Sequence, residues 1–427
     1  MNACYDARAV LLISVLFAGT TLGCELSPKE ELGARIFKDQ ALSQNQNQSC
    51  ASCHSKDTGG TGGDYWVNAH GAVYEGSVSG RFGNRKPPAT TYATLAPRLD
   101  YEPSKGFIGG NFWDGRATGW TLGSPAAEQA QGPFLNPVEQ GLPNATALVH
   151  RVCRSTYGEL FRSVWGKESC SDIEKGYVDI ALSIAAFEDS DWVNQFSSKY
   201  DDVRRGQANL SKLESKGKAL FEGKALCANC HVTGGSGKEP LFTDFGFDNL
   251  GIPKNPENPF YAMDKVLIDG ISVNPLGDDW IDPGLGGFLE TLAAESSWRT
   301  LPYVPASILE MSEGDLKILA MENYGKHRVP TLRNVDKRPN LSFVKAYGHN
   351  GYFKSLKSIV HFYNTRDVLP VCNGAYTEAQ ALAANCWPPP EVTENVTQSG
   401  IGNLGLTNHE EDAIVAFLST LSDTRTP

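Results

Sequence analysis

The sequence of 427 residues has no excess of basic over acidic residues and few methionines. Lys and Arg number 38 against 49 Asp and Glu, so the formal net charge at pH 7 is -11. This balance argues against a nucleic acid as partner, because phosphate binding needs clustered Lys and Arg. Hydrophobic residues at 41% and charged residues at 20% indicate a globular chain rather than a disordered one. The length is sufficient for two ordinary domains.

Long apolar runs are also absent after residue 24, where no segment reaches the ~18 apolar residues of a membrane helix. Ala9 to Gly19 is apolar but short, and it predicts that residues 1–24 form a signal peptide. Its end at Gly23-Cys24 is similar to a lipoprotein cleavage site, although Leu22 stands one position too close to the cysteine. We therefore expect the protein in the periplasm or at the exported cell surface, either free or lipid-anchored at Cys24.

The ten cysteines fit an oxidising compartment. Two lie in or at the edge of the leader, and four belong to two CxxCH motifs. The remaining four form two local pairs, which predict the disulfides Cys153–Cys170 and Cys372–Cys386.

The two CxxCH motifs are Cys50-Ala-Ser-Cys53-His54 and Cys227-Ala-Asn-Cys230-His231. In such a motif the two thiols add to the vinyl groups of a porphyrin, and the adjacent histidine reaches the iron. A zinc site would need further Cys or His at ligand spacing and would leave both histidines unexplained. The motifs therefore predict two covalently bound c-type haems.

The chain around these motifs is similar in its two halves. A short helical pattern with a Gly and a Phe precedes each motif, at Glu31–Lys38 and at Ser215–Glu222. An amphipathic helix is expected late in each half, at Gly176–Phe187 and at Glu410–Leu421. A haem motif between an early and a late helix is the layout of a cytochrome c domain.

The fold class follows from this layout. We expect a mainly α, loop-rich chain with little sheet, because no long stretch alternates polar and apolar residues. The polar stretch Asp201–Ser211 is the favoured boundary between two tandem cytochrome c-like domains. The N-terminal domain would be residues 25–203, with the first haem, and the C-terminal domain residues 204–427, with the second haem.

The second face of each iron decides the chemistry, since two ligands favour electron transfer and an open face permits peroxide chemistry. For the first haem the candidate ligand is His70, which is otherwise a surface histidine in a glycine-rich loop. Tyr363 is one of 15 tyrosines and, from composition alone, a core aromatic. The mature chain offers the second haem few methionines, namely Met263, Met311 and Met321.

Several blocks occur in a fixed order: NFWDGRA at 111–117, EQAQGP at 128–133 with NPVE at 136–139, and VPTLRNV at 329–335 followed by GHNG at 348–351. They resemble the signature blocks of the bacterial di-haem cytochrome c peroxidase and MauG superfamily. The resemblance spans nearly all of the mature chain.

The resemblance implies roles for four residues. Glu139 would lie over the peroxidatic haem, accompanied by Gln129, with Pro133 lining the pocket. A carboxylate can take a proton from one peroxide oxygen and deliver it to the other. Trp113 would lie between the haems and relay electrons. Without the resemblance, Glu139 is a solvated loop carboxylate and Trp113 a core aromatic.

The resemblance also places Tyr363 at the second iron, fourteen residues after His349. Conventional peroxidases carry a methionine there and MauG-like enzymes a tyrosine. A phenolate stabilises high oxidation states of iron, so a bis-Fe(IV)-type state is implied, with oxidation of a side chain on a partner protein. His349 is expected to form a hydrogen bond near the second haem, the alternative being an ordinary loop histidine.

Two further implications concern His70 and a calcium ion. His70 stands where conventional peroxidases carry a distal histidine that must leave the first iron before activity. A calcium ion between the domains would take backbone oxygens of Val344 and Ala346 and the side chain of Asn84. The block around Asn84 departs from the family's RN-x-P pattern.

Three functions therefore compete. The favoured one is a peroxide-dependent di-haem oxidoreductase that oxidises an exported protein substrate. The alternative is a conventional cytochrome c peroxidase that reduces hydrogen peroxide with electrons from a small redox protein. A purely electron-carrying cytochrome would leave Glu139 and Gln129 without a role.

Overall fold

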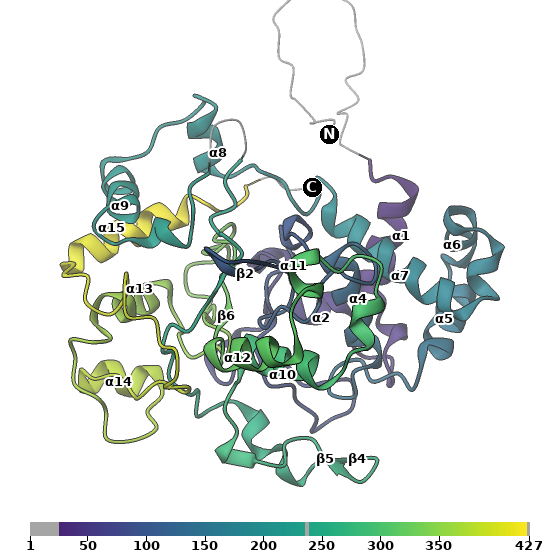
Figure 1. The fold of residues 1–427 in the computed structure, drawn as a ribbon. Helices are drawn as coiled ribbons and strands as arrows, with labels where there is room; N and C mark the ends of the chain where they lie inside the picture. The colour runs from purple at the N-terminus through teal and green to yellow at the C-terminus, as the bar shows by residue number, and fades with distance from the viewer. Residues whose placement is uncertain (1–24, 235–238, 425–427) are drawn as a thin grey trace, which may run out of the picture.

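The computed structural model describes residues 25–234 and 239–424, and these ranges are mainly helical (Figure 1). The predicted leader, with Cys24, lies outside them. The α-helices are α1 Pro28–Lys38, α2 Cys50–Cys53, α3 Tyr65–Ala69, α4 Pro125–Leu135, α5 Ala145–Arg154, α6 Gly158–Trp165, α7 Ile173–Asp189, α8 Lys199–Arg204, α9 Lys212–Glu222, α10 Gly284–Ala294, α11 Ala306–Leu309, α12 Glu313–Glu322, α13 Leu356–Thr365, α14 Glu378–Ala384 and α15 Asn408–Ser419.

Strands are short and paired two by two. The three antiparallel pairs are β1 Asp100–Glu102 with β2 Gly106–Ile108, β3 Phe247–Asp248 with β6 His327–Arg328, and β4 Leu267–Ile268 with β5 Ile271–Ser272. The expectation of a mainly helical chain with little sheet is confirmed. Across the described ranges, every helix is too short or too polar to span a lipid bilayer.

The early and late helices of the N-terminal half cross each other closely. Helix α1 is capped by Ser27, whose hydroxyl accepts from the amide of Glu30 while the Glu30 carboxylate accepts from the Ser27 amide. A Cβ at Gly33 would lie 1.9 Å from the carbonyl oxygen of Ser183 on α7. Only glycine therefore permits this crossing, which brings the α1–α7 pair against the first haem motif.

The C-terminal half repeats the arrangement with α9 and α15. Ser211 and Glu214 form the same reciprocal cap at the start of α9. A Cβ at Gly217 would lie 1.8 Å from the carbonyl oxygen of Ala413 on α15. The two helix pairs lie on opposite sides of the molecule, α9 and α15 on the left of Figure 1 and α1 and α7 on the right. The predicted early and late helices are thus confirmed in both halves.

A third apolar core joins the halves, and the sequence did not predict it. Helices α10 and α12 pack together, and Trp120 and Leu99 of the N-terminal half are buried against them. Trp120 stacks at a tilt on Trp298, with 5.6 Å between ring centroids. This core fixes the N-terminal half against the segment that precedes β6.

Two further expectations can be compared with the structure. The disulfides Cys153–Cys170 and Cys372–Cys386 are both present, as predicted. Asp201, the first residue of the predicted polar boundary, is fully buried, and its carboxylate accepts two hydrogen bonds from Arg333 at 2.8 and 2.9 Å. The position of the domain boundary stays a prediction.

Candidate active site

The first CxxCH motif forms a single helical turn, α2, that ends at His54. The His54 Nδ1 atom lies 2.8 Å from the carbonyl oxygen of Gly60, which fixes the tautomer with Nδ1 protonated. Burial lowers the pKa of His54, so the ring stays neutral. Its Nε2 lone pair is therefore available to an iron on the cavity side.

The second motif has the same construction on different elements. Cys227 begins a 3-10 turn, and the Nδ1 atom of His231 lies 2.8 Å from the carbonyl oxygen of Phe242. Burial again lowers the pKa of the imidazole. Both histidines are thus oriented in the same way, which suits two haems of the same type.

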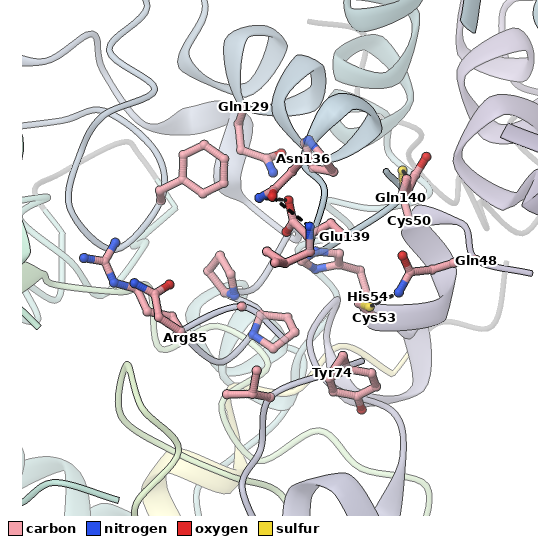
Figure 2. A pocket seen from close by; sticks show the side chains of 18 of the residues that line it. Gln48, Cys50, Cys53, His54, Tyr74, Arg85, Gln129, Asn136, Glu139 and Gln140 are labelled. Carbon is pink, nitrogen blue, oxygen red and sulfur yellow. Dashed lines mark hydrogen bonds between the residues drawn. The ribbon is translucent and has the colours of Figure 1, made fainter. Parts of the chain in front are cut away.

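The first cavity is lined by the first motif and by one face of α4 (Figure 2). Helix α4 starts at Ser124, whose hydroxyl accepts from the amide of Ala127. Gln129 and Pro133 are four residues apart on α4, so they share one helical face, and both line the cavity. The structure therefore brings the predicted pocket residues to His54.

Glu139 completes this wall of the cavity. Its Oε2 atom accepts a hydrogen bond of 2.8 Å from the Nδ2 of Asn136, the residue that ends α4 (Figure 2). Burial raises the pKa of Glu139, and the positive charge of Arg116 partly opposes that rise. A carboxyl group with a raised pKa can both accept and return a proton, as general acid–base chemistry requires.

The second cavity contains His231 and Tyr363 together. Leu356, Ile359 and Tyr363 line it from one face of α13, and the start of that helix is capped by Ser355. Burial raises the pKa of the Tyr363 phenol. A phenolate at this position therefore needs a cation in the cavity to stabilise it.

Trp113 forms part of the wall between the cavities, because it lines both of them. Its indole Nε1 donates to the carbonyl oxygen of Lys86 at 2.8 Å, and its own carbonyl accepts from the amide of Arg328 at 2.8 Å. The N-terminal half thus holds the ring through Lys86, and the C-terminal half holds the main chain of Trp113 through Arg328.

His70 is not among the residues that line the first cavity. It is exposed, its ring stacks on Trp66, and its Nδ1 lies 2.7 Å from the carbonyl oxygen of Trp66. The structure brings the other residues predicted at the first haem to this cavity, but it does not bring His70 there.

His349 is buried and belongs to a polar network beside the second cavity. Its ring lies face to face with that of His327, with centroids 3.6 Å apart, and its Nε2 is 3.5 Å from a carboxylate oxygen of Glu391. Asp282 lies beside both rings and accepts two hydrogen bonds of 2.6 Å from Arg85. Asp282, His327 and His349 each offer a ligand atom, and these atoms all lie within 4.8 Å of one another.

The calcium site predicted at Asn84, Val344 and Ala346 stays a prediction, and these three residues offer no carboxylate. Asn84 lines the first cavity, Ala346 lines the second, and Val344 lines neither. Calcium takes 6–8 oxygen ligands, usually with carboxylates among them. Two lysines lie in this part of the molecule: Lys86 lines both cavities, and Lys345 lines the second.

Sequence reasoning missed three residues of the first cavity. The Nε2 of Gln48 lies 3.9 Å from the sulfur of Cys53, and the Nε2 of Gln140 lies 3.7 Å from the sulfur of Cys50, which are thioether sulfurs once haem is attached. Glu188 follows Ile180 and Ile184 at helical spacing on the buried face of α7. The sequence signal for Glu188 was a charged residue on an otherwise apolar helical face. Burial raises the pKa of Glu188 to about 8.

Comparison with known proteins agrees with these two motif-bearing cavities. A family profile described as di-haem cytochrome c peroxidase matches residues 27–209. The methylamine utilization protein MauG of Paracoccus denitrificans is 30% identical over 405 residues, covering 92% of this chain and 88% of that protein. The chain belongs to the di-haem cytochrome c peroxidase family. It is therefore a peroxidase-type oxidoreductase, and both CxxCH sites fit the two c-type haems of the family.

Other relatives agree with this assignment. Cytochrome c551 peroxidase of Nitrosomonas europaea is 29% identical over 241 residues, covering 56% of this chain and 60% of that protein. The solved structure of the diheme peroxidase BthA of Burkholderia thailandensis is similar, with a TM-score of 0.69, 27% identity, and coverage of 93% and 87% of the two chains. A MauG-like protein associated with microbial copper homeostasis shares the fold, with a TM-score of 0.59, 22% identity, and coverage of 93% and 91%.

Proposed function

We propose that this enzyme uses hydrogen peroxide to oxidise an amino-acid side chain of an exported partner protein. The observation that carries the proposal is Tyr363, which lines the second cavity together with His231. When bound, the two haems supply the redox chemistry by taking two oxidising equivalents from peroxide and holding them until the partner is oxidised. An anionic oxygen ligand from Tyr363 suits that storage better than a thioether would.

Glu139 acts on the protons of the reaction. It receives a proton from one peroxide oxygen and returns it to the other, so that the oxygen–oxygen bond breaks with water as the leaving group. In total, peroxide takes up two electrons and two protons and yields two water molecules. The partner side chain supplies those electrons and protons. Asn136 holds the carboxylate in place through its hydrogen bond.

The placement of His70 supports an enzyme that needs no prior activation. Lys354 donates to the carbonyl oxygen of His70, and Asn255 donates to that of Gly71 at 3.3 Å. A Cβ at Gly351 would lie 2.2 Å from the Cβ of Ala72, so the loop packs directly on the C-terminal half. These contacts hold His70 away from the first cavity and leave its distal side to peroxide and Glu139.

The chain's organisation fits the same proposal. We assign residues 25–203 and 204–427 to two cytochrome c-like domains, the first peroxidatic and the second for electron transfer. Trp113 lies between them and provides the aromatic path for electrons. An exported enzyme, periplasmic or at the cell surface, would meet an exported substrate there.

The similarity to a cytochrome c551 peroxidase favours the alternative, reduction of peroxide with electrons from a small cytochrome. The two functions differ at Tyr363. In the proposed enzyme, Tyr363→Phe changes the ligand-sensitive absorption and EPR spectra of the second haem. Tyr363→Met raises its potential and makes reaction with peroxide depend on prior reduction.

Tyr376→Phe provides a matched control, because Tyr376 does not line the second cavity and its hydroxyl donates to Asn373 instead. Its spectra should equal those of the wild type. Unchanged spectra in the Tyr363→Phe variant would show that tyrosine does not bind the second iron and would favour the alternative.

A further inference from the structure

Lys86 lies in the wall between the two haem cavities and lines both of them. Its side chain is only 7% exposed, and its Nζ donates to the hydroxyl of Thr61 at 2.9 Å and to the carbonyl of Pro87 at 3.1 Å. Its backbone amide donates to the carbonyl of His349, and its backbone carbonyl accepts from Trp113. The ammonium is thus held by two contacts from the N-terminal half, and the backbone amide of Lys86 by one contact from the C-terminal half.

The charge of Lys86 has no counter-charge from the polypeptide. Within the described ranges, no carboxylate forms an ion pair with it, and burial alone lowers its pKa, to about 8. A buried cation without an anion is strongly unfavourable unless something else compensates it. Each haem c carries two propionate carboxylates, which would bring negative charge into the protein once the haems are attached.

A second lysine occupies the same region. The Nζ of Lys345 donates to the carbonyl oxygens of Thr58, Asn334 and Lys337, at 2.9, 2.7 and 3.1 Å. Backbone carbonyls are the ligands that a hard divalent cation would need. Here three such carbonyls, which are not those of Val344 and Ala346, are already bound by the amino group of Lys345.

We infer that the Lys86 ammonium takes the place of the divalent cation expected between the haem domains, so that the enzyme binds no calcium there. Lys86 occupies the asparagine position of the RN-x-P pattern in Arg85-Lys86-Pro87-Pro88. A positive charge between two haems repels the oxidised, more positive state of each iron more strongly than the reduced state. In a medium of low dielectric constant, this repulsion raises the midpoint potentials of both haems. The charge of Lys86 thus acts on the midpoint potentials of both haems.

The first test is the metal content of the holoenzyme with both haems attached. We expect iron at two equivalents and no stoichiometric calcium by mass spectrometry of the metals. Neither a calcium chelator nor added calcium chloride should change the spectra or the melting temperature. One equivalent of calcium, whose removal shifts either haem spectrum, would overturn the inference.

The second test removes the charge. In Lys86→Met the midpoint potentials of both haems should shift to more negative values, and added calcium should not restore them. Lys86→Gln, which keeps a polar side chain, should shift them in the same direction and serves if the methionine variant does not fold. The control is Lys317→Met, because Lys317 is 61% exposed and its amino group pairs with Glu313 on α12.

Unchanged potentials in both Lys86 variants would overturn the assignment. These readouts do not involve peroxide or a partner protein. Failure of the inference can therefore be distinguished from failure of the proposed function, which would show in the Tyr363 variants alone.

Discussion

Replacing Glu139 by glutamine tests the proton chemistry directly. Glutamine retains an oxygen that can accept from Asn136, so the side chain should stay where the carboxylate is now. It cannot exchange a proton with peroxide. General acid–base catalysis contributes about 10²–10⁴-fold. The Glu139→Gln variant should therefore lose that factor, a barrier increase of about 2.7–5.4 kcal/mol at about 1.36 kcal/mol for each tenfold change.

The assay is stopped-flow mixing of the diferric protein with peroxide, followed in the Soret band across a range of pH. Because burial raises the pKa of Glu139, the wild-type rate should fall as the pH drops through a value above the usual ~4.3 of glutamate. The variant should show no such fall. Glu159→Gln is the control, since that side chain is 90% exposed on α6. Wild-type rates in Glu139→Gln would refute the assigned role.

Two other predictions concern Trp113 and Glu188, which both line the first cavity. Trp113→Phe should leave the initial reaction with peroxide intact but slow the response of the second haem, which rapid-freeze EPR can separate; equal kinetics at both haems would rule out the relay. Burial raises the pKa of Glu188 from 4.5 to about 8, so its favourable contribution to folding is full below about pH 4.5 and is lost as the pH rises through about 8. In urea denaturation of the holoprotein, Glu188→Gln should therefore gain stability relative to the wild type over that range, by up to several kcal/mol. Parallel curves of stability against pH would contradict the burial of this carboxyl group.

Features with a local signal could be predicted from the sequence. The CxxCH motifs, the caps and apolar faces of α1 and α15, and the paired cysteines all depend on residues close together in the chain. Helix α10 could not be predicted in this way, because its segment contains three glycines, which disfavour a helix. Packing overrides that preference: a Cβ at Gly286 would lie 2.6 Å from the carbonyl of Ala320 on α12.

The polar network and the placement of His70 show the other limit. Arg85, Asp282 and His327 are far apart in sequence, and none of them lies in a pattern that suggests contact with the others. His70 has a suitable residue type and spacing for an iron ligand. Its position is decided by Lys354 and Asn255, which bind its loop from the other half of the chain.

The most direct test of the central claim is to mix the diferric protein with a stoichiometric amount of peroxide in the absence of reductant, and to follow the Soret and near-infrared absorbance. We predict an immediate reaction and a long-lived near-infrared band shared by both haems, because His70 lies away from the first cavity and Tyr363 lines the second. No reaction until one haem has been reduced would contradict the account and would identify a conventional peroxidase.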